Sequence, residues 1–237
     1  MNKTKGLDFI KRYTMILVLI VVTAFFAWRT GGAILLPMNV SSLISQNAYV
    51  FILATGMLLC ILTGGNIDLS VGSVVCFVGA IGAVLMVNMK MNMWLAILIM
   101  FVIGTLIGAF QGFWIAYVRI PPFIVTLAGM FFARGMTAII SKDMISITNE
   151  TFMAWAKMKL YLPFGGYLNK KGVMVYPYMY PTVVIALVFL VLAFIMLKYT
   201  KFGRSIYAVG GNEQSALMMG LNVRRVKLKA YVLDGFL

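Results

Sequence analysis

The stretch MWLAILIMFVIGTLIGAFQGFWIAYV, residues 93–118, runs without a single charged side chain. A helix needs about 20 apolar residues to cross the hydrocarbon core of a bilayer, so this stretch predicts a transmembrane helix. Comparable apolar runs lie on both sides of it, and the predicted spans are 13–28, 41–62, 69–87, 93–118, 123–140 and 182–197. A seventh helix is predicted to begin near Leu228 and to be cut off at Leu237. The predicted fold class is therefore all-α, a polytopic helical membrane protein with one transmembrane domain over residues 1–237.

Composition narrows the function classes. Hydrophobic residues make up 62% of the chain, charged residues make up 11%, and the mean hydropathy is +0.99. Too few polar residues remain to surround a water-soluble core, which excludes a soluble enzyme. The absence of histidine removes histidine-based catalysis and histidine metal sites. The six acidic residues are scattered in sequence, so no paired-carboxylate site is predicted. We expect no catalytic residues, no metal site and no enzymatic activity.

Basic residues indicate the orientation of the chain. The net charge is +14, and orientation in a bilayer with attraction to anionic lipid explains it better than nucleic-acid binding. The short flanks of the first and sixth predicted spans carry Lys3, Lys5, Lys11, Arg12, Lys198, Lys201 and Arg204. Because positively charged flanks stay in the cytoplasm, a cytoplasmic N-terminus is predicted. The first apolar run lacks a small-x-small cleavage site, which favours an uncleaved anchor over a removed signal peptide.

Small residues recur at four-residue spacing in three of the predicted spans. The ridges are Gly104, Gly108 and Gly112; Gly72, Cys76 and Ala80; and Gly129 with Ala133. Positions four apart lie on one face of a helix, where small side chains let neighbouring helices approach closely. These ridges predict tight helix packing and point to no particular substrate. Cys60 and Cys76 are interpreted as packing residues of the apolar runs.

The run GGNIDLSVG, residues 64–72, interrupts an otherwise apolar stretch. Gly64 and Gly65 are expected to end one helix, while Asn66 or Asp68 accepts hydrogen bonds from the first N–H groups of the next, supplemented by Ser70. One interpretation is a helix cap at a tight turn between helices. The other is a broken or re-entrant helix that lines a polar path.

Arg134 is a charged residue inside the fifth predicted span. It lies eleven residues after Phe123, which places it roughly 16 Å into the span at about 1.5 Å per residue. A charge at that depth either faces the bundle interior or a cavity, or extends toward the outer surface. The preceding Pro121 and Pro122 are expected to set the start of this helix.

Two connections outside the spans carry further predictions. The connection 142–181 is expected to face outward, where its aromatic residues form either an interfacial belt or a receiving surface for a binding protein. The segment 200–229 is expected to face the cytoplasm. Within it Asn212 is predicted to cap a short helix, 213–219, that ends at Gly220. This helix either lies on the membrane or docks a cytoplasmic partner.

Three runs in this order resemble the permease subunits of bacterial monosaccharide ABC importers. They are GGNIDLSVG (64–72), IPPFIVTLAGMFFARG (120–135) and TKFGRSIYAVGGN (200–212). The importers in question are of the ribose, xylose, arabinose and galactose type, and the similarity is nearest to the galactofuranose-type branch. Members of that family continue for roughly another third of their length, so the chain is expected to be truncated at its C-terminus.

The resemblance implies a location, partners and a set of site residues. A second permease subunit (homodimer or heterodimer), a cytoplasmic ABC ATPase and a periplasmic or surface-tethered sugar-binding protein would join this chain in the bacterial cytoplasmic membrane. The chain would bind no cofactor itself, and it contains no G-x-x-x-x-G-K-[ST] sequence for nucleotide phosphates. The predicted residues for coupling to the ATPase are Gly211, Asn212, Glu213, Gln214, Ser215, Ala216 and Gly220. The predicted residues for the translocation path or helix break are Gly65, Asn66, Asp68, Ser70, Phe123, Thr126 and Arg134.

The family's cytoplasmic loop has the pattern Glu-Ala-Ala, three residues, Gly. It maps onto Gln214, Ser215, Ala216 and Gly220, with Gln and Ser replacing the first two residues. The retained helix and glycine favour docking of a partner over a helix that lies on the membrane.

The alternative function is a channel or an ion-coupled secondary transporter for a small polar solute, which would need carboxylates in the spans.

Overall fold

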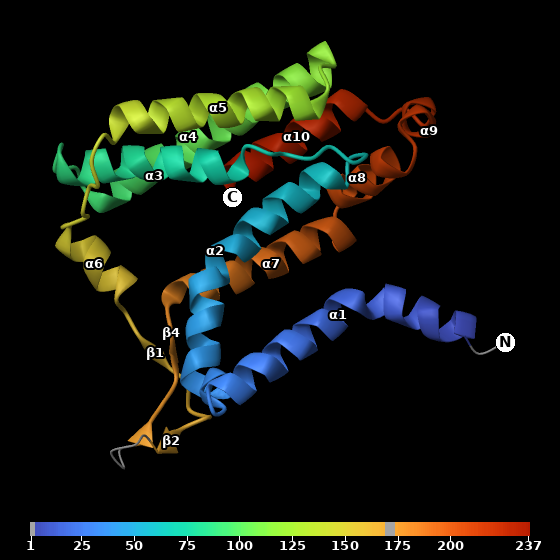
Figure 1. Cartoon of the computed structure of the whole chain (residues 1–237). Coiled ribbons are helices and arrows are strands. Elements are labelled where there is room, and N and C mark those ends of the chain that lie inside the picture. Colours follow the sequence, from blue (N-terminus) through green and yellow to red (C-terminus); the bar gives the residue numbers. More distant parts are fainter. Residues whose placement is uncertain (1–2, 169–173) are drawn as a thin grey trace. The chain divides into compact units, whose positions relative to one another are not determined.

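The computed structural model describes residues 3–168 and 174–237, with side chains from Arg12 onward. The helices in chain order are α1 (Lys3–Arg29), η1 (Ala33–Leu35), α2 (Pro37–Ile61), α3 (Val71–Val87), α4 (Met93–Phe113), η2 (Trp114–Val118), α5 (Pro122–Ile140), α6 (Glu150–Ala156), α7 (Pro181–Tyr199), α8 (Lys201–Gly211), α9 (Glu213–Met218) and α10 (Val223–Phe236). The strands are β1 (Leu160–Tyr161), β2 (Tyr167–Leu168), β3 (Met174–Val175) and β4 (Tyr178–Met179). The predicted helical class is confirmed (Figure 1).

Five helices of the described chain are long and apolar enough to cross a membrane: α1, α2, α4 with η2, α5 and α7. The third predicted span is shorter than expected, because α3 begins at Val71 and has only 17 residues. At about 1.5 Å per residue such a helix is shorter than the ~30 Å hydrocarbon core. The third predicted span is therefore present as a shorter apolar helix that begins two residues later than predicted. The seventh helix is present as α10, which begins at Val223, before the predicted start.

Contacts between Cα atoms divide the chain into two compact units. The first unit holds residues 1–46 and 159–180, and the second holds residues 47–158 and 181–237. In the first unit the short strands form two antiparallel pairs, β1 with β4 and β2 with β3. Ser41 of α2 donates a hydrogen bond from its hydroxyl to the carbonyl of Tyr178, which fastens the start of α2 to β4.

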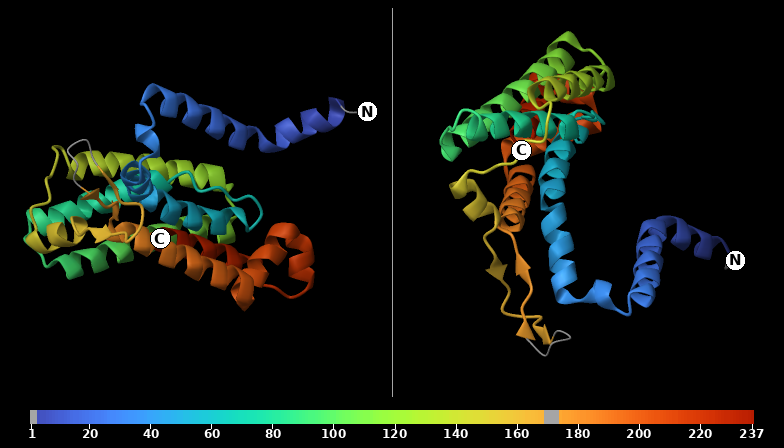
Figure 2. Two further views of the ribbon diagram at one scale, coloured as in Figure 1. Left: turned by 90° about the horizontal axis from the view of Figure 1, so that it is seen from below. Right: turned by 60° about the vertical axis from the view of Figure 1, so that its left-hand side comes forward.

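The glycine ridge of α4 packs against α10 in the second unit. An added Cβ on Gly104 would overlap the carbonyl of Gly235, and one on Gly108 would overlap the carbonyl of Tyr231. A Cβ on Gly112 would lie 2.8 Å from the Cβ of Tyr231. The absence of side chains therefore brings the two helices close together, as the sequence predicted. Figure 2 shows α10 running alongside α4 in two further views.

The other two ridges have different outcomes. Ala133 of α5 is buried, and a Cβ on Gly129 would overlap the side-chain amide of Gln111, so this ridge also packs closely. On α3, Cys76 is exposed and a Cβ on Gly72 would meet nothing within 4 Å. The prediction of close packing is therefore wrong for the α3 ridge within the described chain. Cys60, by contrast, is fully buried, as expected of a packing residue.

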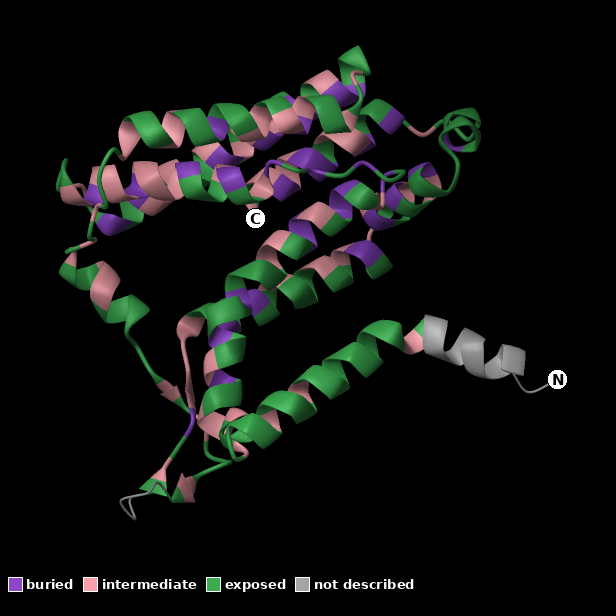
Figure 3. Cartoon of the chain, viewed as in Figure 1, coloured by how far each residue is buried: buried purple, intermediate pink, exposed green. Residues whose placement is uncertain are grey.

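Apolar side chains cover much of the outer surface of the helices. The window Arg12–Arg29 of α1 has none of its residues buried, and Figure 3 colours most of this helix as exposed. On α7, the exposed apolar residues include Val184, Leu187, Val191 and Phe194. Such faces are unfavourable in water and favourable in hydrocarbon. The surface therefore agrees with the composition and identifies a multi-pass membrane protein.

Candidate functional site

The backbone between α2 and α3 is irregular, and its polar groups are bonded within the segment. Gly64 and Gly65 have φ values of 110° and 79°, a region that favours glycine, so the chain leaves α2 abruptly. Thr63 donates from Oγ1 to the carbonyl of Cys60 at 2.7 Å, and Asn66 donates from Nδ2 to Thr63 Oγ1 at 2.8 Å. Of the two residues predicted to accept from the next helix, Asn66 or Asp68, Asn66 instead donates from its amide back toward the end of α2.

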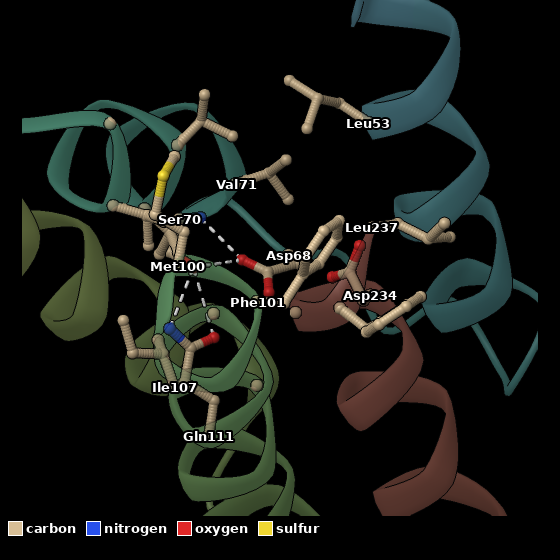
Figure 4. A pocket seen from close by; sticks show the side chains of 18 of the residues that line it. Leu53, Asp68, Ser70, Val71, Met100, Phe101, Ile107, Gln111, Asp234 and Leu237 are labelled. Atoms are coloured by element: carbon tan, nitrogen blue, oxygen red, sulfur yellow. Dashed lines mark hydrogen bonds between the residues drawn. The ribbon is translucent and has the colours of Figure 1, made fainter. Parts of the chain in front are cut away.

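Asp68 bonds to Ser70, the residue just before α3, and not to an N–H group of the helix itself as predicted. Its Oδ1 accepts from the backbone N–H of Ser70 at 2.6 Å and from the Ser70 hydroxyl at 2.7 Å. The Ser70 oxygen in turn accepts from Nε2 of Gln111, on α4, at 2.9 Å. All three residues are buried, with 6%, 1% and 2% of their surfaces exposed. The bonds between Asp68 and Ser70 are therefore part of a network that crosses from the helix break to α4 (Figure 4).

This network lines a pocket in the second unit. The pocket has a volume of about 310 Å³, and α2, α3, α4 and α10 contribute to its wall. Asp234 of α10 also lines it, and Figure 4 shows its carboxylate turned toward that of Asp68. The expectation that the acidic residues form no pair is therefore wrong. Helix packing brings Asp68 and Asp234 to one cavity although the sequence keeps them far apart.

Asp234 is the residue that the sequence-based site missed, together with Gln111. Gln111 carried a signal, since it is a lone amide in the uncharged run 93–118. Asp234 is 8% exposed, and its Oδ2 accepts a long hydrogen bond of 3.5 Å from the Cys60 thiol. Its Oδ1 and the hydroxyl of Tyr231 are buried without a hydrogen-bond partner among the described residues. These two polar atoms of α10 are therefore buried in the helix packing with incomplete hydrogen bonding.

The predicted path residues of α5 do not line this pocket. Phe123 is 61% exposed, while Thr126 is fully buried and its hydroxyl bonds to the carbonyl of Pro122 at 2.9 Å. Arg134 is exposed, and its Nε donates to the hydroxyl of Ser73 on α3 at 3.2 Å. Of the predicted path residues, Asp68 and Ser70 therefore line the pocket together, whereas the three residues of α5 lie outside it. Gly65 is exposed on the turn, and Asn66 is buried beside α2.

The short helix predicted after Asn212 is present as α9. Asn212 accepts at Oδ1 from the N–H of Ser215 at 2.9 Å, and the helix ends before Gly220, whose φ is 79°. Gly211 ends α8, so two helices meet at Asn212. The cap and the terminating glycine are where the sequence predicted them, because both are local features of the chain.

One side of α9 is anchored and the other is exposed. Ala216 is fully buried in a cluster with Leu59 of α2, Ile206 of α8 and Tyr231 of α10. Glu213 pairs with Lys227 of α10 through an Oε2–Nζ distance of 2.7 Å. Gln214 and Ser215 are exposed, as are the three apolar residues that follow Ala216: Leu217 is 52%, Met218 88% and Met219 67% exposed. The exposed residues 217–219 therefore form a small apolar surface on the side of α9 that faces away from α2, α8 and α10.

The predicted outward connection contains more regular structure than a plain loop. It includes α6, which Asn149 caps by accepting from the N–H of Phe152 at 3.1 Å, and the two strand pairs. The rings of Tyr161, Tyr178 and Tyr180 make edge contacts, and Lys159 lies 4.4 Å from the ring centre of Tyr178. Lys170 and Lys171 of this connection lie outside the described residues. The function of this connection stays a prediction.

The comparison with known proteins agrees with this architecture. The family described as "branched-chain amino acid transport system / permease component" matches residues 39–237. The inner membrane ABC transporter permease protein YjfF of Escherichia coli is 35% identical over 195 residues, covering 82% of this chain and 55% of YjfF. The xylose transport system permease protein XylH of the same organism is 32% identical over 278 residues, covering 95% of this chain and 69% of XylH.

The ribose import permease protein RbsC of Escherichia coli is 36% identical over 199 residues, covering 84% of this chain and 58% of RbsC. The chain therefore spans about half to two thirds of the length of these relatives. No solved structure matches it. The expected resemblance to monosaccharide permeases is confirmed. The chain belongs to the permease components of ABC importers, the family that includes the xylose and ribose permeases.

Proposed function

We propose that this chain is the membrane-spanning subunit of an ATP-driven importer that moves a monosaccharide across the bacterial cytoplasmic membrane. The names of its relatives, for xylose and for ribose transport, support a sugar as the substrate. A second permease subunit, identical or not, would complete the path, and a sugar-binding protein outside the cell would deliver the substrate. A cytoplasmic ATPase would hydrolyse ATP, since the chain has no phosphate-binding loop sequence. The galactofuranose-type branch stays a prediction.

The capping and packing of α9, which leave its apolar residues exposed, are the observation that supports this proposal. An isolated helix of this length is not stable in water, so its position depends on the packing of Ala216 and the cap at Asn212. The anchored helix presents Leu217, Met218 and Met219 outward, and an exposed apolar cluster suits contact with another protein. With the N-terminus in the cytoplasm, this surface faces the side where ATP is hydrolysed.

The packing also offers a mechanical link from α9 to the helix break. Ala216 packs in one cluster with Leu59 and Cys60, at the end of α2, and with Tyr231 of α10. Asp234 lies about one turn beyond Tyr231 and lines the pocket with Asp68. A displacement of α9 would therefore be passed to both walls of the pocket, because close-packed helices move as rigid bodies.

Cross-linking tests the docking role. The chain is co-expressed with the ATPase of a monosaccharide importer, and Met218→Cys carries a short thiol cross-linker, with Met144→Cys as the matched control. Both positions are highly exposed methionines, 88% and 95%, and Met144 lies on the predicted outward connection. We expect a cross-link to the ATPase from Met218→Cys alone. A cross-link from neither position, or equally from both, contradicts docking at α9.

Orientation is tested with the same pair of variants. A membrane-impermeant thiol reagent applied to intact cells should label Met144→Cys and leave Met218→Cys unlabelled until the membrane is opened. Labelling of Met218→Cys in intact cells would place α9 outside and remove it from any ATPase. The background carries Cys76→Ser, because Cys76 is exposed in the described chain and Cys60 is buried.

Transport by an ion gradient is the alternative, and the Asp68–Asp234 pair is the observation that would favour it. Uptake measured with the reconstituted importer distinguishes ATP-driven transport from transport driven by an ion gradient. Uptake of radiolabelled D-xylose or D-ribose should require ATP on the side of the ATPase and should persist with a protonophore. Uptake that ignores ATP and collapses with the proton gradient contradicts the proposal.

A further inference from the structure

Two buried carboxyl groups from distant parts of the chain face one another beside the helix break. Asp68 and Asp234 are both buried, and both line the same pocket. Figure 4 shows their carboxyl groups turned toward each other, and the two side chains lie within hydrogen-bonding reach. Two ionised carboxylates repel strongly where little water screens them, so such a pair favours a state in which only one of them is charged.

No basic side chain of the described residues neutralises this pair. The wall of the pocket contains no lysine or arginine, and the ion pair between Glu213 and Lys227 involves neither aspartate. A hard cation needs six or more oxygen ligands or retained waters, whereas a proton needs only the two oxygens that it joins. A shared proton therefore removes the repulsion without any added ion.

The donors around the two carboxyl groups are unequal. Oδ1 of Asp68 accepts from the N–H of Ser70 at 2.6 Å and from its hydroxyl at 2.7 Å. Oδ2 of Asp234 accepts from the Cys60 thiol, a weak donor, at 3.5 Å. Oδ1 of Asp234 receives no hydrogen bond from the described residues and packs against α2, where an added Cβ on Gly56 would overlap it. Hydrogen bonds stabilise the ionised form that accepts them, so the charge belongs on Asp68 and the proton on Asp234.

We propose that Asp234 is a neutral carboxylic acid whose O–H donates to the ionised Asp68, so that one shared proton fastens α10 to the helix break. Such a hydrogen bond is charge-assisted, a kind that is shorter and stronger than one between neutral groups. Together with the bond between Ser70 and Gln111, it joins the break to both α4 and α10. The inference goes beyond the proposed function and does not depend on it.

The shared proton predicts a response to pH. Unfolding would release this proton to neutral solution, so the folded chain should become less stable as the pH rises. The other titratable groups beside the pair are the Cys60 thiol of α2 and the Tyr231 hydroxyl of α10. Thiols and phenols lose their protons above about pH 8, so measurements between about pH 5 and 8 report on the carboxyl pair.

Infrared spectroscopy of the purified full chain tests the proton directly. The chain is held in an ester-free detergent, because the C=O stretch of a protonated carboxyl group overlaps that of lipid esters. We expect the band of one protonated carboxyl group at neutral pH, shifted to lower frequency in D₂O and absent from Asp234→Asn. Absence of this band from the parent chain, or its persistence in Asp234→Asn, overturns the proposal.

Thermal unfolding supplies a second measurement. Asp234→Asn keeps a donor toward Asp68 but has no proton to release, so its melting temperature should depend less on pH than that of the parent chain. Asp143→Asn is the matched control, since it replaces an exposed carboxylate outside the pocket wall and should keep the parent's dependence. Equal pH dependence of the parent chain and Asp234→Asn contradicts a shared proton.

Two further outcomes are decisive. If Asp234→Asn does not fold, ¹³C labelling of the aspartate carboxyl groups should still shift the infrared band of the parent chain, and an unshifted band overturns the proposal. Stabilisation of the parent chain by Na⁺ over choline at equal ionic strength, with no acid band at neutral pH, would place a cation between the carboxylates instead of a proton. ATP-dependent uptake decides the permease role separately, so failure of either proposal leaves the other standing.

Discussion

Gly108 of α4 and Gly235 of α10 face one another with no side chain between them. A Cβ built on Gly108 would lie 2.9 Å from Cα of Gly235, and a Cβ on Gly235 would lie 2.8 Å from Cα of Gly108. The contact is reciprocal and involves backbone on both sides, so neither helix can yield by turning a side chain. This contact sets the distance between the two helices that carry Gln111 and Asp234.

Substitution of either glycine should separate the helices. Gly108→Ala and Gly235→Ala are each expected to destabilise the fold by about 1–3 kcal/mol, the usual cost of overpacking. Thermal unfolding in detergent measures the effect. Gly135→Ala on α5 is the matched control, since a Cβ there meets nothing within 4 Å. Equal stability of Gly108→Ala and Gly135→Ala would contradict the close α4–α10 contact.

The cap at Asn212 should decide whether α9 is formed. Asn212→Ala removes the acceptor for the N–H of Ser215 and is expected to cost about 0.5–2 kcal/mol. Because α9 is short, the loss should appear as faster amide exchange at residues 213–219 with little change elsewhere. Asn212→Asp retains the acceptor and should protect the same amides as the parent chain does. Unchanged exchange in Asn212→Ala would show that packing of Ala216 alone holds the helix.

The left-handed conformation of Gly220 should matter for docking of the ATPase. Gly220→Val places a branched side chain at a φ of 79°, which strains the turn by about 1–2 kcal/mol and shifts the end of α9. Co-purification with the ATPase should fall. Gly220→Asn is the control, because asparagine tolerates this conformation. If Gly220→Val co-purifies fully with the ATPase, the conformation of this turn is not needed for docking.

The ion pair between Glu213 and Lys227 should contribute little to stability. The Glu213 side chain is 52% exposed, so solvent screens the pair and a coupling energy below about 1 kcal/mol is expected. A double-mutant cycle with Glu213→Gln and Lys227→Gln measures it, and the coupling should shrink further at high salt. A coupling well above this limit would show that the pair orders α9 against α10.

The bond between Gln111 and Ser70 should stabilise the helix break. Gln111→Leu leaves the Ser70 oxygen without its donor and is expected to cost about 1–3 kcal/mol. Gln111→Glu keeps the shape but places a third carboxyl in the pocket, so its stability should fall as the pH rises and that carboxyl ionises. Unfolding temperatures over a range of pH distinguish the two variants. If the unfolding temperature of Gln111→Glu does not depend on pH, the new carboxyl does not lie close to Asp68 and Asp234.

The sequence alone determined the features that depend on neighbours along the chain. Uncharged apolar runs located the long helices, Asn212 and Gly220 located the ends of α9, and the glycine ridge of α4 predicted a close approach. Hydropathy and capping act within one or two turns, which is why these predictions were confirmed. Pro121 and Pro122 likewise set the start of α5, which begins at Pro122.

Only the tertiary structure decided which distant residues meet. Asp234 reaches Asp68 because α10 packs on α4 at the distance that Gly108 and Gly235 allow, and no local pattern encodes that crossing. The same packing turns the α3 ridge of Gly72 and Cys76 away from its neighbours, and it leaves Arg134 bonded to Ser73 rather than beside the pocket. Helical periodicity fixes which residues share a face, whereas the partner of each face depends on the packing of the whole bundle.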